Sequence, residues 1–199
     1  MPYESRGQAM GSARLRMTRE MSVPERVRWT VQQLAVTPSE HVLEVGGGLG
    51  HAVELVASRL TRGSMTAIDR SAAMVARASA AHAALIEKGR VRIECIALET
   101  VTSPETLGRP HFDKAFAINV NAFWTSPAAS LPRLRHIVRK GGRVYLTYQP
   151  PAAHIVERLR AQLPVLLEGA GFAVEAVEVR DFQRAAGVCV VGRRTQDNG

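Results

Sequence analysis

The sequence predicts an α/β fold organised around a mostly parallel sheet. Short apolar runs alternate with helical segments, and each strand–helix unit takes about 25 residues, as expected for right-handed crossover connections. The last two apolar runs are separated only by a short loop at residues 185–187. Because so short a connection joins antiparallel strands, the final strand is expected to run against its neighbours.

A leading helix is expected first, with Ser22 as its N-cap and Glu25 completing a capping box. Five strand–helix units and two closing strands follow it. The predicted strands cover residues 41–45, 65–68, 91–96, 114–118, 143–148, about 173–182 and about 188–192. The later helices are predicted at about 49–60, at 72–88, after 126–127, and around 155–166, where Pro164 should kink the last of them.

Length and composition favour one domain. The chain has 199 residues, of which 46% are hydrophobic and 22% are charged, as is usual for a globular protein with its own core. Residues 1–21 lack periodicity and are expected to form a flexible N-terminal arm. Residues 22–194 are expected to form the single domain, and residues 195–199 a disordered tail.

The charge is strongly basic but dispersed. A formal net charge of +8 and an isoelectric point near 10.5 permit an anionic partner such as nucleic acid. However, no run of five or more like charges concentrates the basic residues on one segment. A nucleic-acid partner is therefore possible but not favoured.

The cysteines and the lengths of the apolar runs indicate the cellular compartment. Cys95 and Cys189 lie far apart in apolar segments, which favours free thiols in a reducing environment. No apolar run is long enough to span a membrane, and no signal-peptide pattern opens the chain. We therefore expect a cytoplasmic protein without a membrane partner.

The most informative stretch begins at Glu44 and continues through a turn with glycine at positions 46–48 and 50. It follows a predicted buried strand and precedes a helix. Without Cβ atoms, the turn lets a ligand approach the backbone, and the N–H groups at the start of the helix face the same space. The Glu44 carboxylate beside it can accept hydrogen bonds from a cation. The combination suits a nucleoside with a positively charged amino-acid tail.

A dinucleotide or phosphate-loop site is excluded by spacing. The dinucleotide pattern G-x-G-x-x-G fails at its sixth position, which is His51 when counted from Gly46 and Val53 when counted from Gly48. The phosphate-loop pattern G-x-x-x-x-G-K-S/T does not occur. The glycine turn therefore indicates another class of nucleoside ligand.

The pattern that fits is Glu-x-Gly-x-Gly-x-Gly, formed by Glu44, Gly46, Gly48 and Gly50, and it resembles the class I S-adenosylmethionine-dependent methyltransferases. The resemblance covers roughly residues 24–194 and is closest to small bacterial methyltransferase-domain proteins. It implies a Rossmann-like, seven-stranded sheet in the order 3-2-1-4-5-7-6, with strand 7 antiparallel and helices on both faces. It also implies S-adenosylmethionine as cofactor and S-adenosylhomocysteine as product.

The same resemblance implies the cofactor-binding residues. Asp69, at the end of the second strand, would accept both ribose hydroxyls, and Glu44 would bind the methionyl ammonium. The acid that the family often has after strand three is absent unless Glu99 takes its place. The residues assigned to the cofactor are Glu44, Gly46, Gly47, Gly48, Gly50, Asp69, Arg70, Met74, Ala97, Leu98 and Asn119.

The sequence is less specific about the residues that would bind the methyl acceptor. Methyl transfer needs a general base only when the acceptor must lose a proton, and His51 and His154 are the candidates. Phe123, Trp124 and Tyr148 are expected to line a substrate-binding pocket. The ends of the fourth and fifth strands carry no acid, so no metal is expected.

The sequence thus predicts a methyltransferase acting at O, N or C of a small, partly apolar molecule, as a monomer or homodimer. One alternative is an RNA or protein methyltransferase, although residues 119–124 lack the prolines of the N/D-P-P-Y/F motif of enzymes that methylate nucleic-acid amino groups. The other is an S-adenosylmethionine-binding protein without methyl transfer, acting as a scaffold, a regulator or a non-methylating catalyst.

Overall fold

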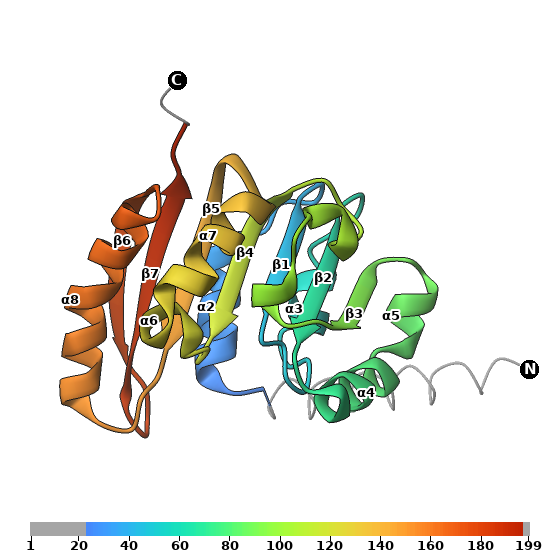
Figure 1. Ribbon diagram of the computed structural model, residues 1–199. Helices are drawn as coiled ribbons and strands as arrows, with labels where there is room; N and C mark the ends of the chain where they lie inside the picture. Colours follow the sequence, from blue (N-terminus) through green and yellow to red (C-terminus); the bar gives the residue numbers. More distant parts are fainter. Residues whose placement is uncertain (1–22, 197–199) are drawn as a thin grey trace, which may run out of the picture.

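A seven-stranded sheet forms the centre of the molecule (Figure 1). The computed structural model describes residues 23–196. The strand order is β3-β2-β1-β4-β5-β7-β6, and only β7 runs antiparallel to both of its neighbours. The predicted fold class, strand order and antiparallel final strand are therefore confirmed.

The strands are β1 His41–Val45, β2 Ser64–Asp69, β3 Val91–Cys95, β4 Phe112–Ile118, β5 Val138–Tyr148, β6 Phe172–Asp181 and β7 Ala186–Arg194. The α-helices are α2 Glu25–Leu34, α3 Val53–Ala57, α4 Ala72–Ala81, α5 Ala83–Glu87, α6 Ala122–Thr125, α7 Pro127–Ile137 and α8 Ala153–Gly169. Two 3-10 turns, η1 Leu98–Thr100 and η2 Pro104–Leu107, lie between β3 and β4.

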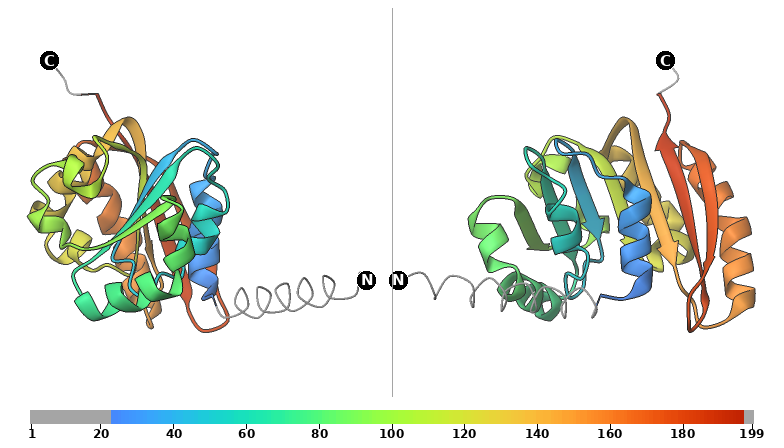
Figure 2. Two further views of the ribbon diagram at one scale, coloured as in Figure 1. Left: turned by 90° about the vertical axis from the view of Figure 1, so that its right-hand side faces the viewer. Right: turned by 180° about the vertical axis from the view of Figure 1, so that it is seen from behind.

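Helices cover both faces of the sheet (Figure 2). On one face, apolar residues of α7 and α8 such as Leu134 and Leu163 join the core cluster. On the other face, α2 and α3 contribute residues such as Leu34 and Val56 to a second cluster. The central strands are buried on both faces because each faces a helical layer, which explains their continuous apolar sequences.

Three helices differ from the sequence predictions. The helix expected at 49–60 begins only at Val53, because the positive φ of Gly50 (75°) keeps the preceding turn non-helical, and it ends at Ala57. The helix expected at 72–88 is divided into α4 and α5 at His82, whose φ is −120°. By contrast, α8 continues through Pro164, where its neighbours Leu163 and Leu167 are fully buried in the core.

The predictions for the two ends of the chain concern the first helix cap, the N-terminal arm and the C-terminal tail. Pro24 occupies the N-cap position of α2 without a side-chain hydrogen bond, and the predicted cap Ser22 lies outside the described residues. The predicted arm at 1–21 also lies outside them. Thr195, which was assigned to the tail, is held by its N–H and hydroxyl on the carbonyl of Gly171, at 3.1 and 2.9 Å. Within residues 23–196, no helix is both long enough and apolar enough to cross a membrane.

Candidate active site

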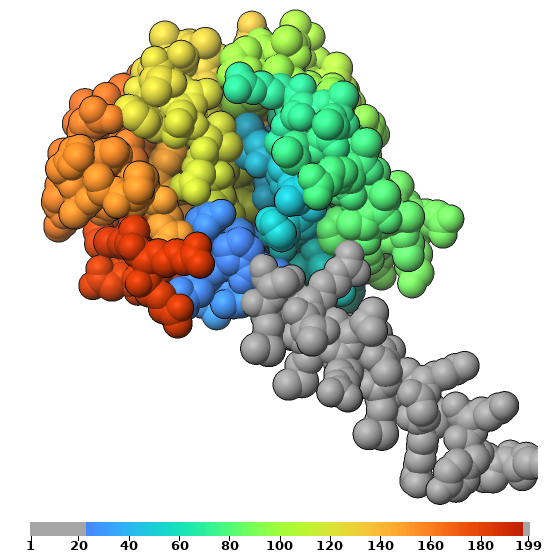
Figure 3. Space-filling view, turned by 90° about the horizontal axis from the view of Figure 1, so that it is seen from below, coloured from blue at the N-terminus to red at the C-terminus, as the bar shows by residue number. Residues whose placement is uncertain are grey.

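A cavity of about 640 Å³ opens where the strand order changes direction, at the carboxyl ends of β1 and β4. In the view onto this edge, a hollow lies between the residues after β4 and those after β2 (Figure 3). Six of the predicted cofactor residues line the cavity: Gly46, Asp69, Arg70, Ala97, Leu98 and Asn119. The fold therefore brings together residues from four strand ends that are distant in sequence.

The glycine turn is fixed to the end of β2 by its backbone. The N–H groups of Gly46 and Gly47 both donate to the carbonyl of Ile68, at 2.8 and 3.0 Å. Gly46, Gly48 and Gly50 all have positive φ, at 73°, 52° and 75°, so this path of the chain requires glycine at alternate positions. Of the turn glycines, Gly46 lines the cavity, whereas Gly47, Gly48 and Gly50 line a smaller recess beside Asp69.

Asp69 connects the glycine turn to the start of α4. Its Oδ2 accepts from the Gly48 N–H at 2.8 Å, and its Oδ1 accepts from the Ser71 N–H at 2.9 Å. A carboxylate offers about four acceptor positions, so the side chain retains capacity for two further donors. This arrangement fits a pair of ribose hydroxyls at the cavity.

Glu44 lies beneath the turn, in the interior of the sheet. Its side chain is buried, and Oε2 has no hydrogen-bond partner among the described residues. The oxygen lies 3.4 Å from where a Cβ on Gly47 would be. Burial, with a smaller contribution from the charge of Asp69, raises the pKa of Glu44 to about 8. A buried acceptor without a partner is what an ammonium group would complete.

His82 supports the glycine turn, a role that the sequence did not predict. It forms the break between α4 and α5, is buried, and places Nε2 3.0 Å from the Gly50 carbonyl oxygen. The contact joins residues 32 positions apart, so no local pattern indicates it. The one available signal was a histidine within an otherwise alanine-rich helical segment.

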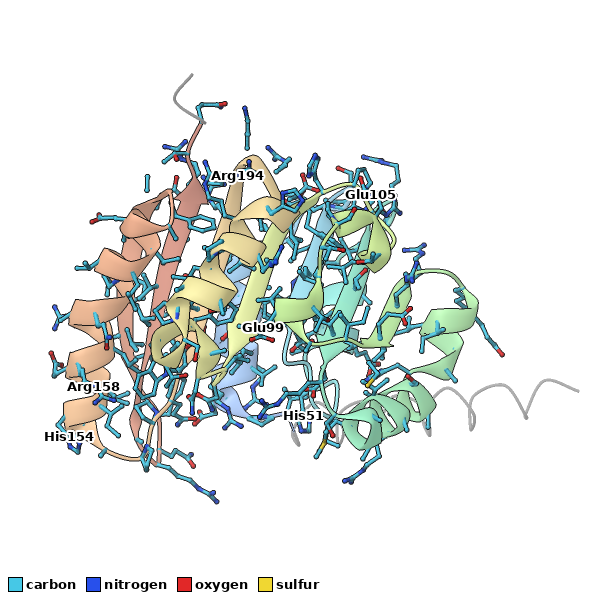
Figure 4. The ribbon with its side chains drawn as sticks, in the orientation of Figure 1. His51, Glu99, Glu105, His154, Arg158 and Arg194 are labelled. Atoms are coloured by element: carbon cyan, nitrogen blue, oxygen red, sulfur yellow. The ribbon has the colours of Figure 1, made fainter. Side chains whose placement is uncertain are left out.

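The segment after β3, which the family resemblance assigns to the adenine ring, forms another wall of the cavity. Ala97 and Leu98 line the cavity, as does Glu99 at the η1 turn, which Figure 4 labels. Glu99 is exposed and is the acidic side chain available where the family often has its acid. Met74 is half-buried on α4, with its N–H donated to Ser71 Oγ at 3.4 Å, and does not line the cavity.

The two predicted histidine bases lie apart from each other. His51 is exposed directly after the glycine turn, whereas His154 is exposed at the start of α8, near Arg158 (Figure 4). Neither side chain lines the cavity. The fold therefore does not bring these two histidines together at one reacting atom.

The predicted aromatic wall separates into three environments. Phe123 is among the residues that line the cavity, and its side chain is at the same time fully buried against the core. Trp124 faces α8, where the Arg158 guanidinium lies 4.7 Å from its ring centroid. Tyr148 is buried, and its hydroxyl donates to the Val120 carbonyl at 2.5 Å. Burial raises the pKa of this phenol above its ordinary value.

Comparison with known proteins decides the family. A family model described as "Methyltransferase domain" matches residues 43–144, slightly more than half of the chain and the segment from β1 into β5. The chain belongs to this methyltransferase family. Together with the glycine turn and the strand order, the match makes it a class I S-adenosylmethionine-dependent methyltransferase.

Individual relatives agree with this assignment. The methyltransferase is 23% identical over 171 residues to the uncharacterized methyltransferase YdaC of Bacillus subtilis, covering 84% of this chain and 90% of that protein. It is 30% identical over 154 residues to a protein-L-isoaspartate O-methyltransferase of Methylorubrum populi. That match covers 76% of this chain but only 65% of the relative.

Solved structures share the fold at low sequence identity. Magnesium protoporphyrin IX methyltransferase from Synechocystis with bound S-adenosylhomocysteine is 16% identical, with a TM-score of 0.64. That match covers 90% of this methyltransferase and 84% of the Synechocystis chain. The [4+2]-cyclase SpnF has a TM-score of 0.70 at 16% identity, with coverage of 85% and 79%.

The methyltransferase's own residues fit S-adenosylmethionine. Glu44 offers an unpartnered buried oxygen for the ammonium, and Asp69 offers free acceptor positions for the ribose. Gly46 lines the cavity, and because the glycines of the turn have no side chains, a ligand there could approach the backbone closely. When bound, the cofactor supplies an electrophilic methyl group on a sulfonium.

Gly46→Ala is expected to weaken binding of S-adenosylhomocysteine more than Gly48→Ala, by about tenfold or more. Both positions have positive φ, so alanine carries a backbone cost of about 1–2 kcal/mol at either one. Only at Gly46 would the added Cβ also overlap a side chain, that of Val120, whereas Gly48 has no heavy atom within 4 Å. Calorimetric titration measures the difference.

A double variant isolates the Val120 contact. Val120→Ala in the Gly46→Ala background removes the overlapping methyl group but leaves the backbone cost. It should therefore recover affinity to the level of Gly48→Ala. Equal losses in the two single variants would contradict the view that Gly46 is needed for close approach to the segment after β4.

Proposed function

We propose that the methyltransferase transfers the methyl group of S-adenosylmethionine to O, N or C of a small, partly apolar molecule. The observation that carries the proposal is the recess of about 640 Å³ at the carboxyl ends of the parallel strands, a volume typical of small-molecule sites. Beyond the predicted cofactor residues, its wall includes the apolar Ala122 and the polar Asn121 and Thr125. This mixture suits a compact acceptor with one or two polar groups.

Positioning would provide most of the catalysis. Methyl transfer is an in-line displacement, in which alignment and exclusion of water account for much of the rate. The protein would hold the cofactor at Glu44 and Asp69 and orient the acceptor against the α6 wall. His51 is proposed as the base only for an acceptor that must lose a proton, since of the two candidates it adjoins the glycine turn.

The distribution of charge argues against a polynucleotide acceptor. Arg139 pairs with Asp113, and Arg143 and Arg193 both pair with Glu175, at 2.6 to 2.8 Å. These pairs lie at the amino ends of the parallel strands, opposite the cavity. Part of the basic charge is therefore neutralised and directed away from the site, whereas RNA binding favours a continuous basic surface.

A protein acceptor is the second candidate function. The observation that favours it is the 30% identity to a protein-L-isoaspartate O-methyltransferase, whose name specifies methylation of a protein carboxyl group. The chain spans only 65% of that relative, so residues beyond the match are absent from the comparison. A small-molecule acceptor and a protein acceptor predict different destinations for the methyl group.

An assay with methyl-labelled S-adenosylmethionine separates these functions. The purified protein would be incubated with three fractions of a cell extract: small molecules, protein and RNA. We expect label only in the small-molecule fraction, in a product extractable into organic solvent. Label precipitating with protein or RNA would identify the corresponding alternative and overturn the proposal.

The same assay also tests the alternative that the protein binds S-adenosylmethionine without transferring its methyl group. The [4+2]-cyclase SpnF shares this fold, so the fold alone does not require methyl transfer. Tight binding of S-adenosylhomocysteine with no label transferred to any fraction would support that alternative. A variant with Asp69→Asn serves as the negative control, because it should lose any transfer that depends on the cofactor site.

A further inference from the structure

The chain bends sharply where β4 ends, at Asn119. Its φ is 58°, a left-handed conformation that L-residues seldom adopt, although asparagine tolerates it better than most. Within residues 23–196, Ala35 is the other non-glycine residue with positive φ, and it caps α2. A conformation of this kind persists only where the surrounding structure holds it.

Three consecutive residues at the end of β5 hold the bend. The carbonyl of Thr147 accepts from the Asn119 N–H at 2.8 Å, and the N–H of Gln149 donates to Asn119 Oδ1 at 2.8 Å. Between them, the Tyr148 hydroxyl donates to the Val120 carbonyl at 2.5 Å. We refer to Thr147, Tyr148 and Gln149 as the β5 clamp.

The clamped bend forms a wall of the cofactor cavity. Asn119 and Val120 both line it, facing the glycine turn across β1 and β4. The Val120 side chain occupies the space beside Gly46 so closely that a Cβ there would overlap it. The position of the bend therefore sets the space available at the methionyl end of the site.

The clamp is itself anchored by elements on the other side of the sheet. Thr147 Oγ1 makes a buried hydrogen bond with Thr30 Oγ1 of α2, at 3.0 Å. The Gln149 side chain accepts from Arg26 at 3.4 Å and donates to the Ala185 carbonyl at 3.2 Å. Because α2 and the loop between β6 and β7 both contact it, the clamp has little freedom to move away from the bend.

We propose that Tyr148 and Asn119 are positioning residues that hold the bend after β4 in the shape that binds the cofactor. Tyr148 acts through the Val120 carbonyl instead of contacting the acceptor, as its burial and its hydrogen bond indicate. Asn119 acts through its left-handed backbone and its Oδ1 acceptor. The proposal rests on cofactor binding and is independent of which acceptor is methylated.

Tyr148→Phe tests the hydroxyl with a matched control, Tyr145→Phe. Tyr145 lies on the same strand and is also buried, but its hydroxyl makes no hydrogen bond to another described residue. Loss of one useful hydrogen bond should weaken binding of S-adenosylhomocysteine by about fivefold in Tyr148→Phe. Tyr145→Phe should bind as the unaltered protein does. Calorimetry gives the affinities, and thermal unfolding without ligand gives the stability of each variant.

The outcomes distinguish positioning from general stability. A loss of affinity confined to Tyr148→Phe, with similar melting temperatures for both variants, supports the proposal. Unchanged affinity in Tyr148→Phe, or equal losses in the two variants, overturns it. Failure of the unaltered protein to bind S-adenosylhomocysteine would instead overturn the cofactor assignment on which the proposal rests.

A series at Asn119 tests the backbone independently. Asn119→Asp retains an oxygen acceptor and tolerance of positive φ, Asn119→Gly retains only the tolerance, and Asn119→Ala retains neither. Affinity for S-adenosylhomocysteine should therefore decrease in the order aspartate, glycine, alanine. Affinity in all three variants equal to that of the unaltered protein would show that the bend does not depend on Asn119 and would overturn its positioning role.

Discussion

Glu44→Gln is expected to weaken binding of S-adenosylhomocysteine by about fivefold, because it replaces a charge-assisted hydrogen bond worth about 2 kcal/mol with a neutral one worth about 1 kcal/mol. The same substitution should stabilise the ligand-free protein above neutral pH. Both effects follow from a carboxyl group that is buried without a hydrogen-bond partner for Oε2 among the described residues. The two measurements are calorimetric titration and urea unfolding.

The direction of the stability effect follows from the raised pKa. In the unfolded chain Glu44 titrates near 4.5, whereas in the folded protein its pKa is about 8. Between these values the folded state retains a proton that the unfolded state has released. The free energy of unfolding should therefore fall as pH rises from about 4.5 to about 8, by a few kcal/mol at most, and Glu44→Gln should remove that slope.

Binding should also release a proton. A ligand ammonium favours the ionised carboxylate, so near pH 7 the cofactor displaces the proton that Glu44 holds in the free protein. Affinity for S-adenosylhomocysteine should then increase between about pH 6 and 7, where the ligand amino group remains charged. Titrations in two buffers of different ionisation enthalpy measure the proton directly.

The control for this prediction is Glu99→Gln. Glu99 lines the cavity but is exposed, whereas Glu44 is buried beneath the glycine turn, so substitution of Glu99 should leave the proton release unchanged. A binding enthalpy that is independent of buffer in the unaltered protein would contradict a protonated Glu44. Proton release that persists in Glu44→Gln would assign the titrating group elsewhere.

Asp69→Asn is expected to weaken S-adenosylhomocysteine binding by about 1–3 kcal/mol, from loss of charge-assisted hydrogen bonds. Both carboxylate oxygens already accept backbone N–H groups, from Gly48 and Ser71. An asparagine amide has only one acceptor oxygen, so its nitrogen would face one of these donors. The substitution should therefore loosen the glycine turn as well as remove a ribose contact.

Binding of adenosine tests whether Asp69 contacts the ribose. Asp69→Asn should lose affinity for adenosine and for S-adenosylhomocysteine alike, since both contain the ribose. Asp181→Asn, an exposed aspartate at the end of β6, is the matched control and should bind both ligands normally. Unchanged affinity in Asp69→Asn would mean that the ribose is not held at the end of β2.

Much of the fold could be predicted because its signals are local. Buried parallel strands produce continuous apolar runs, and the short connection at 185–187 required an antiparallel final strand. Spacing also placed Gly46 and Asp69 at adjacent strand ends, and both line the cavity. Helix boundaries were less reliable, since Gly50 and His82 end helical segments through turn geometry and tertiary contact.

The acceptor side shows which properties the sequence did not predict. Phe123 follows β4 and lines the cavity, but its complete burial in the core was not expected for a residue in the segment after a strand. Tyr148 looked accessible at the end of β5, yet its hydroxyl reaches back to Val120, 28 positions earlier. Sequence position indicates which strand end a residue occupies, but not which way its side chain points.

By itself, the sequence determined the α/β fold, the glycine turn and the acids beside it, because periodicity and spacing specify strands, turns and the order of strand ends. Only the tertiary structure decided that Glu44 is buried with a pKa near 8, that His82 contacts Gly50, and that the β5 clamp fixes Asn119. These properties arise from contacts between distant segments. Burial and hydrogen bonding at such contacts depend on how the helices and strands pack, which no local pattern encodes.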